Sequence, residues 1–306
     1  MKKILIATDK PFSKAAVQNI NDIVKKAGYD FALLEKYTAV SDLHKALADA
    51  DALIVRSDII DKAAFDAAKK LQIVVRAGAG YDNIDLVSAS SKGVVVMNTP
   101  GQNSNAVAEL VFGMLIYLNR GGFDGSTGSE LRGKKIGIHA YGYVGRIVAT
   151  IAKGFKMEVH AYDPFVDRKI IENDGVIWEK DTKGLFANCQ YVSIHIPLTS
   201  ETKESVNYDL MKLLPQGATI VNTARKEVIH EPSLQKMFIE RPDFRYATDV
   251  TPDCKEVLSG YAGRYFATPK KMGAQTAEAN NNAGAAAANQ IINFFEKGDK
   301  TFQVNK

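Results

Sequence analysis

The feature that most constrains the fold is a repeated alternation of short apolar runs with amphipathic stretches along the chain. In the N-terminal part, the apolar runs predict buried strands, at residues 4–7, 52–56, 73–76 and 94–98. Amphipathic stretches at residues 13–26 and 63–70 lie between them and predict helices. Strand–helix alternation is typical of a parallel sheet with helices on both faces.

A second alternating series begins at Lys135. A helical pattern from Asn103 to Arg120 and a glycine-rich loop at 121–133 precede it, and an alanine-rich helix is predicted at 276–297. The strands of this series are predicted at residues 136–139, 158–162, 191–196, 218–222, 246–250 and 265–267. The sequence therefore predicts an α/β fold of two Rossmann-like or flavodoxin-like doubly wound parallel-sheet domains, with a cleft between them. The final residues, FQVNK, are expected to form a short strand or a tail.

Composition excludes several classes of function. The 306 residues are 46% hydrophobic and 24% charged, which is the ordinary balance of a globular protein. The net charge of +4 is too even for a nucleic-acid-binding surface. The two cysteines, Cys189 and Cys254, lie in no paired motif, so we expect no metal. No stretch is long and apolar enough for a signal peptide or a membrane span, so a cytoplasmic protein without membrane partners is expected.

Residues 140–145, AYGYVG, follow one predicted strand and open a helix, as a dinucleotide-binding turn does. Gly142 would let the backbone approach a pyrophosphate, and Gly145 would let the helix pack closely on its strand. The N–H groups of Tyr143 and Val144 would meet the phosphates at the helix start. The motif is partial, because Ala140 stands at the first glycine position, and an ordinary glycine-containing turn explains it equally well.

The next predicted strand ends at Asp163, the spacing at which an acidic residue hydrogen-bonds the adenosine ribose. A carboxylate there also repels a 2′-phosphate, so NAD is favoured over NADP as the cofactor. The alternative is a simple turn residue before Pro164.

Several longer motifs carry a more specific resemblance: VRAGAGYDNID at 75–85, NTP at 98–100 through AVAE at 106–109, HIPLT at 195–199, NTAR at 222–225 and DV at 249–250. Over essentially its whole length the chain resembles the D-isomer-specific 2-hydroxyacid dehydrogenases. Within that family it is most similar to short phosphoglycerate dehydrogenases that have no C-terminal regulatory domain. The resemblance implies a substrate-binding domain of residues 1–100 plus 287–306, an NAD-binding Rossmann domain of residues 101–286, and a homodimer.

The resemblance also implies roles for individual residues. Arg225 would bind the substrate's carboxylate and keto oxygen, because a guanidinium pairs a carboxylate through two parallel hydrogen bonds. Ala77 and Gly78 would offer backbone N–H groups to the same carboxylate. Asp249 would accept a hydrogen bond from the nicotinamide carboxamide, and Ala224 would contact the cofactor. The alternatives are a surface ion pair for Arg225, an exposed strand-end carboxylate for Asp249 and a plain turn for Gly78.

His195 is placed by the resemblance beside the adenosine, together with Pro197 and Thr202. It is therefore rejected as the group that transfers the substrate proton. The remaining histidines lie in no recognised motif and are expected to be structural: His44, His139, His160 and His230.

The chain departs from the family at the proton-transfer position. Most members carry a histidine in a TPHxGG segment and a glutamate in a DVFxxEP segment, whereas residues 268–273 read TPKKMG and 249–254 read DVTPDC. Aligning the segment on Gly273 puts Lys271 at the histidine position, and aligning it on Thr268 puts Lys270 there. We prefer Lys271 as the acid–base, with a pKa lowered by Arg225, Lys270 and burial. The alternative is a solvated pair of loop lysines.

Arg56 and Ser57 end one predicted strand, and Arg76 ends its neighbour. Two arginines are more charge than one carboxylate requires, and guanidinium groups suit phosphate oxygens. We therefore expect NAD-dependent oxidation of 3-phospho-D-glycerate to 3-phosphohydroxypyruvate, the first step of L-serine biosynthesis. The alternatives are another D-2-hydroxyacid dehydrogenase, such as a glyoxylate/hydroxypyruvate reductase, and a non-catalytic NAD-binding regulator. A further alternative is that each arginine forms an ion pair with a nearby acid, such as Asp51 or Asp82, and does not bind a phosphate.

Overall fold

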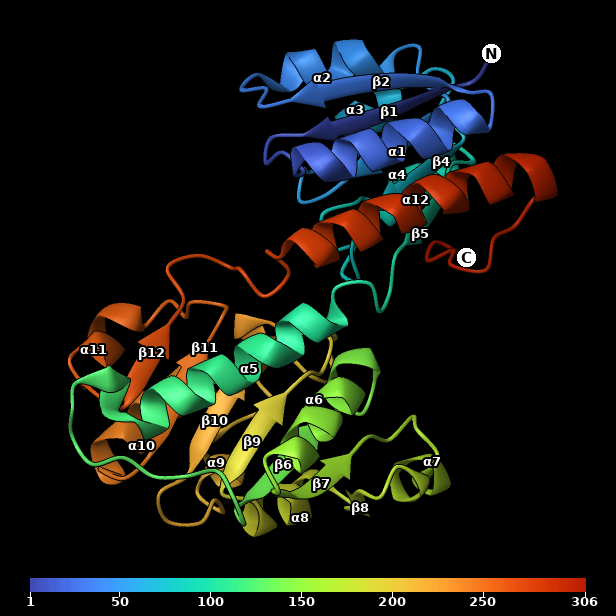
Figure 1. The fold of residues 1–306 in the computed structure, drawn as a ribbon. Helices are drawn as coiled ribbons and strands as arrows, with labels where there is room; N and C mark the ends of the chain where they lie inside the picture. Colours follow the sequence, from blue (N-terminus) through green and yellow to red (C-terminus); the bar gives the residue numbers. More distant parts are fainter. The chain divides into compact units, whose positions relative to one another are not determined.

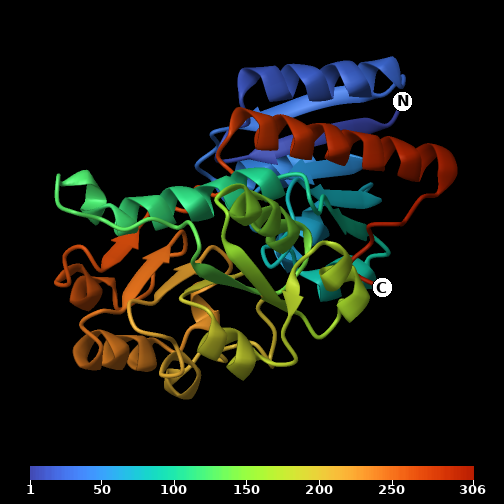
Figure 2. The same ribbon diagram turned by 60° about the horizontal axis from the view of Figure 1, so that its bottom comes forward.

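The computed structural model describes all residues from Met1 to Lys306, and they form two compact units (Figure 1). Unit 1 comprises Met1–Asn103 and Ala274–Lys306, and unit 2 comprises Ser104–Gly273. The second segment of unit 1 therefore begins at Ala274, earlier than the expected residue 287. The reason is that one uninterrupted helix, α12 (Ala277–Lys297), packs along α1 (Lys14–Lys26) of unit 1, as both ribbon views show (Figures 1 and 2).

Unit 1 is built on a five-stranded parallel sheet in the order β2-β1-β3-β4-β5. The strands are β1 (Lys3–Thr8), β2 (Asp30–Glu35), β3 (Ala52–Val55), β4 (Ile73–Arg76) and β5 (Val95–Asn98). This is the doubly wound order in which the winding direction reverses between β1 and β3. β2 was not predicted from the sequence, although residues 31–34, FALL, form a short apolar run; in the structure this edge strand is only partly buried.

Helices cover both faces of the unit 1 sheet. Apolar side chains of α1 and α12 pack on one face, and those of α2 (Val40–Leu47), α3 (Lys62–Ala67) and α4 (Leu86–Ser91) on the other. A Cβ at Gly284 of α12 would lie 2.7 Å from Ile20 Cδ1, so a glycine permits the close approach of α12 to α1. The C-terminal tail lies along β5, where Val304 N–H donates to Val96 O at 2.9 Å.

Unit 2 contains a seven-stranded parallel sheet in the order β12-β11-β10-β9-β6-β7-β8. The strands are β6 (Lys135–His139), β7 (Glu158–Tyr162), β8 (Ile177–Trp178), β9 (Tyr191–Ile194), β10 (Thr219–Asn222), β11 (Arg245–Thr248) and β12 (Tyr265–Ala267). Here the winding reverses between β6 and β9. Because β9 and β11 end sooner than expected, His195 and Asp249 lie just beyond strand ends.

The helices of unit 2 also form two layers (Figure 1). Apolar residues of α5 (Ser104–Asn119), α6 (Tyr143–Gly154) and α7 (Arg168–Asn173) share one core with the sheet. Those of α8 (Thr182–Asn188), α9 (Tyr208–Met211), α10 (Glu231–Glu240) and α11 (Lys255–Ser259) share the other. None of the helices in either unit combines the length and the apolar character needed to cross a bilayer.

Candidate functional site

The predicted nucleotide-binding residues gather where the winding of the unit 2 sheet reverses, at the carboxyl ends of β6 and β9. Doubly wound sheets bind ligands at this position. The turn after β6 begins with Ala140 at φ +82°, and its N–H donates to Tyr162 O of β7 at 2.9 Å. A Cβ on Gly145 would lie 2.3 Å from Ala140 O, so only glycine lets α6 sit this close to the turn.

The start of α6 has the geometry that a pyrophosphate requires. The first hydrogen bond of the helix runs from Arg146 N–H to Gly142 O, so the amides of Tyr143 and Val144 precede it and can donate elsewhere. A Cβ built on Gly142 would have no heavy atom within 4 Å, which leaves open space over the turn. These groups fit a dinucleotide phosphate, because orphan amides and the helix dipole both favour anions.

Asp163 directly follows β7 and is 9% exposed. Its Oδ2 accepts a hydrogen bond from Tyr141 N–H and its Oδ1 one from Phe165 N–H, each at 2.8 Å. The carboxylate is therefore fixed beside the glycine-containing turn. Each carboxylate oxygen can accept a second hydrogen bond, so the predicted ribose contact remains open to Asp163.

The ring of His195 lies between two hydroxyl groups. Its Nε2 is 2.8 Å from Ser193 Oγ, and its Nδ1 is 3.5 Å from Thr223 Oγ1. Burial, and to a lesser extent the nearby His139, lowers the pKa of His195 to about 3. With so low a pKa the ring is a weak proton acceptor, and its place beside the adenosine stays a prediction.

The segment after His195 is closed by Thr202. Its Oγ1 donates to Pro197 O at 2.5 Å and accepts from Thr199 N–H at 2.8 Å. Thr202 thus holds Pro197 in place through the loop backbone. In this structure its hydroxyl is used inside the loop.

The turn that carries Arg225 is held by Asn222, the last residue of β10. Asn222 Oδ1 accepts from Ala224 N–H, and its Nδ2 donates to Arg225 O, both at 2.9 Å. Arg225 is partly buried, and its Nη1 donates to Ala224 O. The sequence analysis did not assign this role to Asn222. An asparagine at the end of a strand, where its side chain can bond the backbone of the next residues, is a signal for such a turn.

Asp249 is 2% exposed, and its carboxylate faces the segment that contains the two lysines. Oδ1 accepts from Thr268 Oγ1 at 2.7 Å and from Met272 N–H at 2.8 Å, while Oδ2 accepts from Gly273 N–H at 2.8 Å. The sequence predicted only a cofactor contact for Asp249 and missed these bonds. One lone pair of Oδ2 remains for a further donor.

Lys270 and Lys271 are both exposed. The expectation that burial helps to lower the pKa of Lys271 is therefore wrong, because the bonds of the segment to Asp249 bury Thr268 and Gly273 and leave the lysines outward. Asp253 is 2.6 Å from Lys226 Nζ, so its carboxylate is engaged away from the lysine segment.

In unit 1 the winding of the sheet reverses between β1 and β3, and Arg56 lies at this point. Its Nη1 donates to the backbone oxygens of Lys10 and Pro11, at 3.1 and 3.0 Å, and its guanidinium lies 5.1 Å from the centre of the Phe12 ring. Burial lowers the pKa of Arg56 from its ordinary value, but an arginine remains charged in proteins. The adjacent Ser57 is exposed.

Arg76 ends β4, next to β3 in the sheet. Its Nη1 would be 1.4 Å from a Cβ on Gly78, whose φ is +152°, so a glycine is required for the arginine to take this position. Ala77 N–H donates to Val55 O and Gly78 N–H to Arg76 O, both at 2.8 Å. The prediction that these amides are open to a substrate carboxylate is wrong, because the β3–β4 ladder and a tight turn use them.

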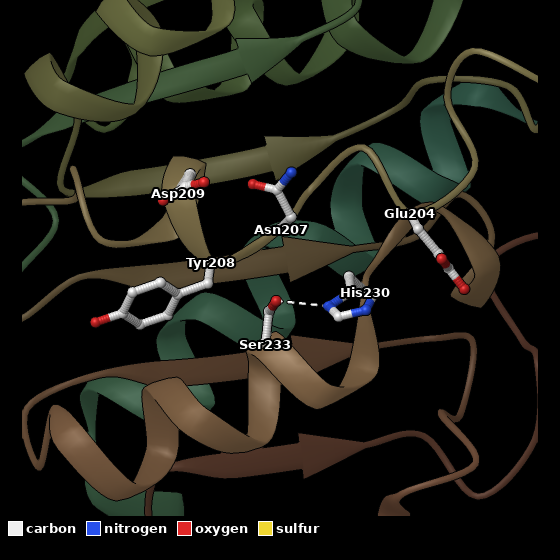
Figure 3. Close-up of a pocket in the computed structure, with 6 residues that line it drawn as sticks. All are labelled: Glu204, Asn207, Tyr208, Asp209, His230 and Ser233. Atoms are coloured by element: carbon white, nitrogen blue, oxygen red, sulfur yellow. Dashed lines mark hydrogen bonds between the residues drawn. The ribbon is translucent and has the colours of Figure 1, made fainter.

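Figure 3 shows a separate pocket of about 280 Å³ in unit 2. It contains none of the predicted site residues, and its lining is polar: Glu204, Asn207, Tyr208, Asp209, His230 and Ser233. In this pocket, His230 Nδ1 is 2.6 Å from Ser233 Oγ. Outside it, His160 is hydrogen-bonded to Glu158 and Glu179, so both histidines have protein partners. No cluster of three or more His, Cys, Asp or Glu residues that could hold a metal ion is present.

Comparison with known proteins gives a family match over nearly the whole chain. Residues 5–305 match the family described as D-isomer specific 2-hydroxyacid dehydrogenase, catalytic domain. The chain is 34% identical to D-3-phosphoglycerate dehydrogenase of Methanocaldococcus jannaschii, over 82% of this chain and 51% of that protein. It is 30% identical to hydroxypyruvate reductase of Thermotoga maritima, over 95% of this chain and 98% of that protein. The chain thus spans about half the length of the first of these relatives.

Solved structures show the same likeness. An NAD⁺-bound 3-phosphoglycerate dehydrogenase of Entamoeba histolytica is 48% identical, with a TM-score of 0.93, and the match covers 100% of this chain and 99% of that one. D-lactate dehydrogenase of Escherichia coli, at 23% identity and a TM-score of 0.83, covers 99% of each chain and shares the fold.

Proposed function

Because the chain belongs to the D-isomer-specific 2-hydroxyacid dehydrogenase family, we propose that it oxidises 3-phospho-D-glycerate to 3-phosphohydroxypyruvate with NAD. The observation that carries the choice of substrate is the placement of Arg56 and Arg76. They follow and end two adjacent strands of unit 1, at the same edge of the sheet, since Val55 pairs with Arg76. Two guanidinium groups on neighbouring strand ends suit a substrate that carries a phosphate as well as a carboxylate.

The relatives support this substrate. The Methanocaldococcus jannaschii and Entamoeba histolytica proteins are both named for 3-phosphoglycerate. By analogy with phosphoglycerate dehydrogenases, we also propose that the reaction is the first step of L-serine biosynthesis and that the enzyme is a homodimer.

The proposed cofactor is NAD, held in unit 2 by the turn at Gly142, the amides of Tyr143 and Val144, and the carboxylate of Asp163. When bound, its nicotinamide supplies the acceptor for the hydride that leaves the substrate's carbinol carbon. Asp163 disfavours NADP, because a second anion would have to approach its buried carboxylate. His195, Pro197, Thr202, Ala224 and Asp249 are proposed as further contacts to the cofactor.

The chemistry on the substrate requires a proton acceptor and an anion holder. Arg225 would bind the carboxylate and stabilise the oxygen as it becomes a carbonyl, because a fixed charge is most effective where charge develops. Lys271 would take the hydroxyl proton through its neutral amine. Arg225 cannot take it, since an arginine stays protonated.

The substrate proposal is tested with a panel of 3-phosphoglycerate, D-glycerate and D-lactate, assayed by NADH formation. The phosphorylated acid should give the highest kcat/KM. Arg56→Leu should raise the KM for 3-phosphoglycerate about tenfold or more, the effect of losing a charged hydrogen-bonding partner, and should change D-glycerate oxidation much less. Arg76→Leu should behave alike. An equal loss for both acids would show that the arginines do not bind a phosphate.

A second candidate activity is reduction of hydroxypyruvate or glyoxylate. It is favoured by the Thermotoga maritima relative, which is named hydroxypyruvate reductase and matches over 98% of its length. This candidate predicts that unphosphorylated keto acids outcompete 3-phosphohydroxypyruvate in NADH consumption. The same panel, run in the reducing direction, separates the two.

A further inference from the structure

Asp249, proposed above as a contact to the cofactor, also binds the segment that carries the two lysines. Its buried carboxylate accepts three hydrogen bonds from the segment 268–273. One donor precedes the lysine pair in the sequence, and two donors follow it. Thr268 donates from before Lys270 and Lys271, and Met272 and Gly273 donate from after them. Both exposed lysines therefore lie within a loop that a single carboxylate closes.

The backbone of the same region continues the network to Arg225. Asp249 N–H donates to Asn222 O at 3.1 Å, and Thr248 Oγ1 donates to the same oxygen at 3.0 Å. The side chain of Asn222 in turn binds Ala224 N–H and Arg225 O. A continuous set of hydrogen bonds thus joins the turn of Arg225 to the loop of Lys271.

We propose that Asp249 is a positioning residue, which with Asn222 holds the loop of Lys271 in a fixed relation to the turn of Arg225. The inference rests on the proposed function, because it assigns to Lys271 the proton and to Arg225 the substrate anion. A proton acceptor must lie within hydrogen-bond reach of the hydroxyl that Arg225 holds, so their relative placement limits the rate.

The network explains the residue types. A carboxylate is a pure acceptor and can take three donors, whereas the amide of an asparagine would turn an N–H₂ group toward Met272 or Gly273 N–H. A Cβ on Gly273 would lie 3.0 Å from Asp249 Oδ2 and 3.2 Å from Val107 Cγ2, so a larger residue there would crowd the carboxylate. We call the three hydrogen bonds of Asp249 to Thr268, Met272 and Gly273 the Asp249 clamp. Its geometry favours an aspartate at 249 and a glycine at 273.

The test uses the full chain and two readouts. The first is the rate of tryptic cleavage after Lys270 and Lys271, quantified by mass spectrometry, which does not depend on activity. In Asp249→Asn, this cleavage should rise about tenfold or more, because the loop opens more often. Thr268→Val removes one of the three donors at nearly constant shape and should give a smaller rise. Asp253→Asn is the matched control, because Asp253 is an exposed aspartate in the segment that follows β11, four residues after Asp249. This variant should be cleaved at the native rate.

The second readout is kinetic. Asp249→Asn should lower kcat about tenfold or more. Thr268→Val, at a residue that is no proposed cofactor contact, should lower kcat severalfold and leave the NADH dissociation constant, measured by fluorescence, within about twofold. Cleavage at the native rate in a folded Asp249→Asn variant would overturn the proposal, as would native kcat with weakened NADH binding. If Asp249→Asn does not fold, Thr268→Val decides in the same way. A native chain that turns over no substrate would contradict the proposed function, while the tryptic readout still decides whether the clamp exists.

Discussion

At the scale of the residue, the two histidines nearest the predicted cofactor turn are held neutral. Burial lowers the pKa of His139 to about 4 and that of His195 to about 3. A lysine that replaces histidine as acid–base starts from a pKa near 10.4, so its neutral form is scarce at neutral pH. Lys271 is exposed, so like-charge neighbours rather than burial would have to lower its pKa.

Lys271→Ala should lower kcat roughly 10²–10⁴-fold, the usual effect of removing a general acid–base, with NADH binding nearly unchanged. In the native enzyme, oxidation should accelerate toward alkaline pH as the amine deprotonates, and reduction should favour lower pH, where Lys271 is charged. Steady-state rates across pH measure both.

Lys270→Ala is the matched control for this experiment, because it removes the adjacent exposed amine. It should reduce the rate only mildly, through the charge that Lys270 contributes beside Lys271. Near-native turnover in Lys271→Ala would remove the lysine from the mechanism, and loss of the alkaline limb in His195→Ala would assign it to the histidine.

His139 makes the stability of the chain depend on pH. Its folded pKa of about 4 lies below the ordinary value of 6.5, so the unfolded chain binds the proton more readily. Its contribution to stability is complete above pH 6.5 and is lost as the pH falls toward 4, by up to about 3 kcal/mol. Urea unfolding at pH 7 and pH 4.5 should show this loss, and His139→Leu should reduce it. An unchanged difference in the variant would assign the loss to other groups.

At the scale of the element, the turn from β6 into α6 shows what a glycine-rich sequence can and cannot predict. Gly142 and Gly145 were predicted from the partial motif, and the structure gives a steric reason for Gly145, whereas at Gly142 it shows only open space over the turn. Asp249 could not be predicted in its clamping role, because its three donors come from a segment that only the folded sheet brings near. The partly buried edge strand β2 was missed, although residues 31–34 form a short apolar run.

Gly145→Ala should destabilise unit 2 by about 1–3 kcal/mol, because its Cβ would lie 2.3 Å from Ala140 O and 2.9 Å from Ile138 Cγ2. Gly154→Ala, at the other end of the same helix, is the control: nothing lies within 4 Å of its Cβ, so the change should be neutral or mildly stabilising. Denaturant unfolding of both variants measures the difference. Equal free energies of unfolding for the two variants would show that the turn and the helix can move apart to make room for the Cβ at 145.

At the scale of the whole molecule, two doubly wound units each place their predicted ligand-binding residues where the winding reverses. Alternation of strands and helices was enough to predict this architecture, because each parallel strand needs a crossover helix. The bounds of the units were less predictable. The return of the chain to unit 1 at Ala274 depends on the packing of α12 on α1, including the contact of Gly284 with Ile20, and no local signal in the sequence marks it.

As a member of its family, this chain is expected to transfer a hydride between NAD(H) and a 2-hydroxy or 2-keto acid. The most direct measurement is NADH absorbance after adding 3-phosphohydroxypyruvate, hydroxypyruvate, glyoxylate or pyruvate to the purified chain. We expect rapid NADH consumption, fastest with the phosphorylated acid, and a product of D configuration. A chain that binds NADH yet consumes none with all four acids would be a non-catalytic NAD-binding protein and would contradict the account.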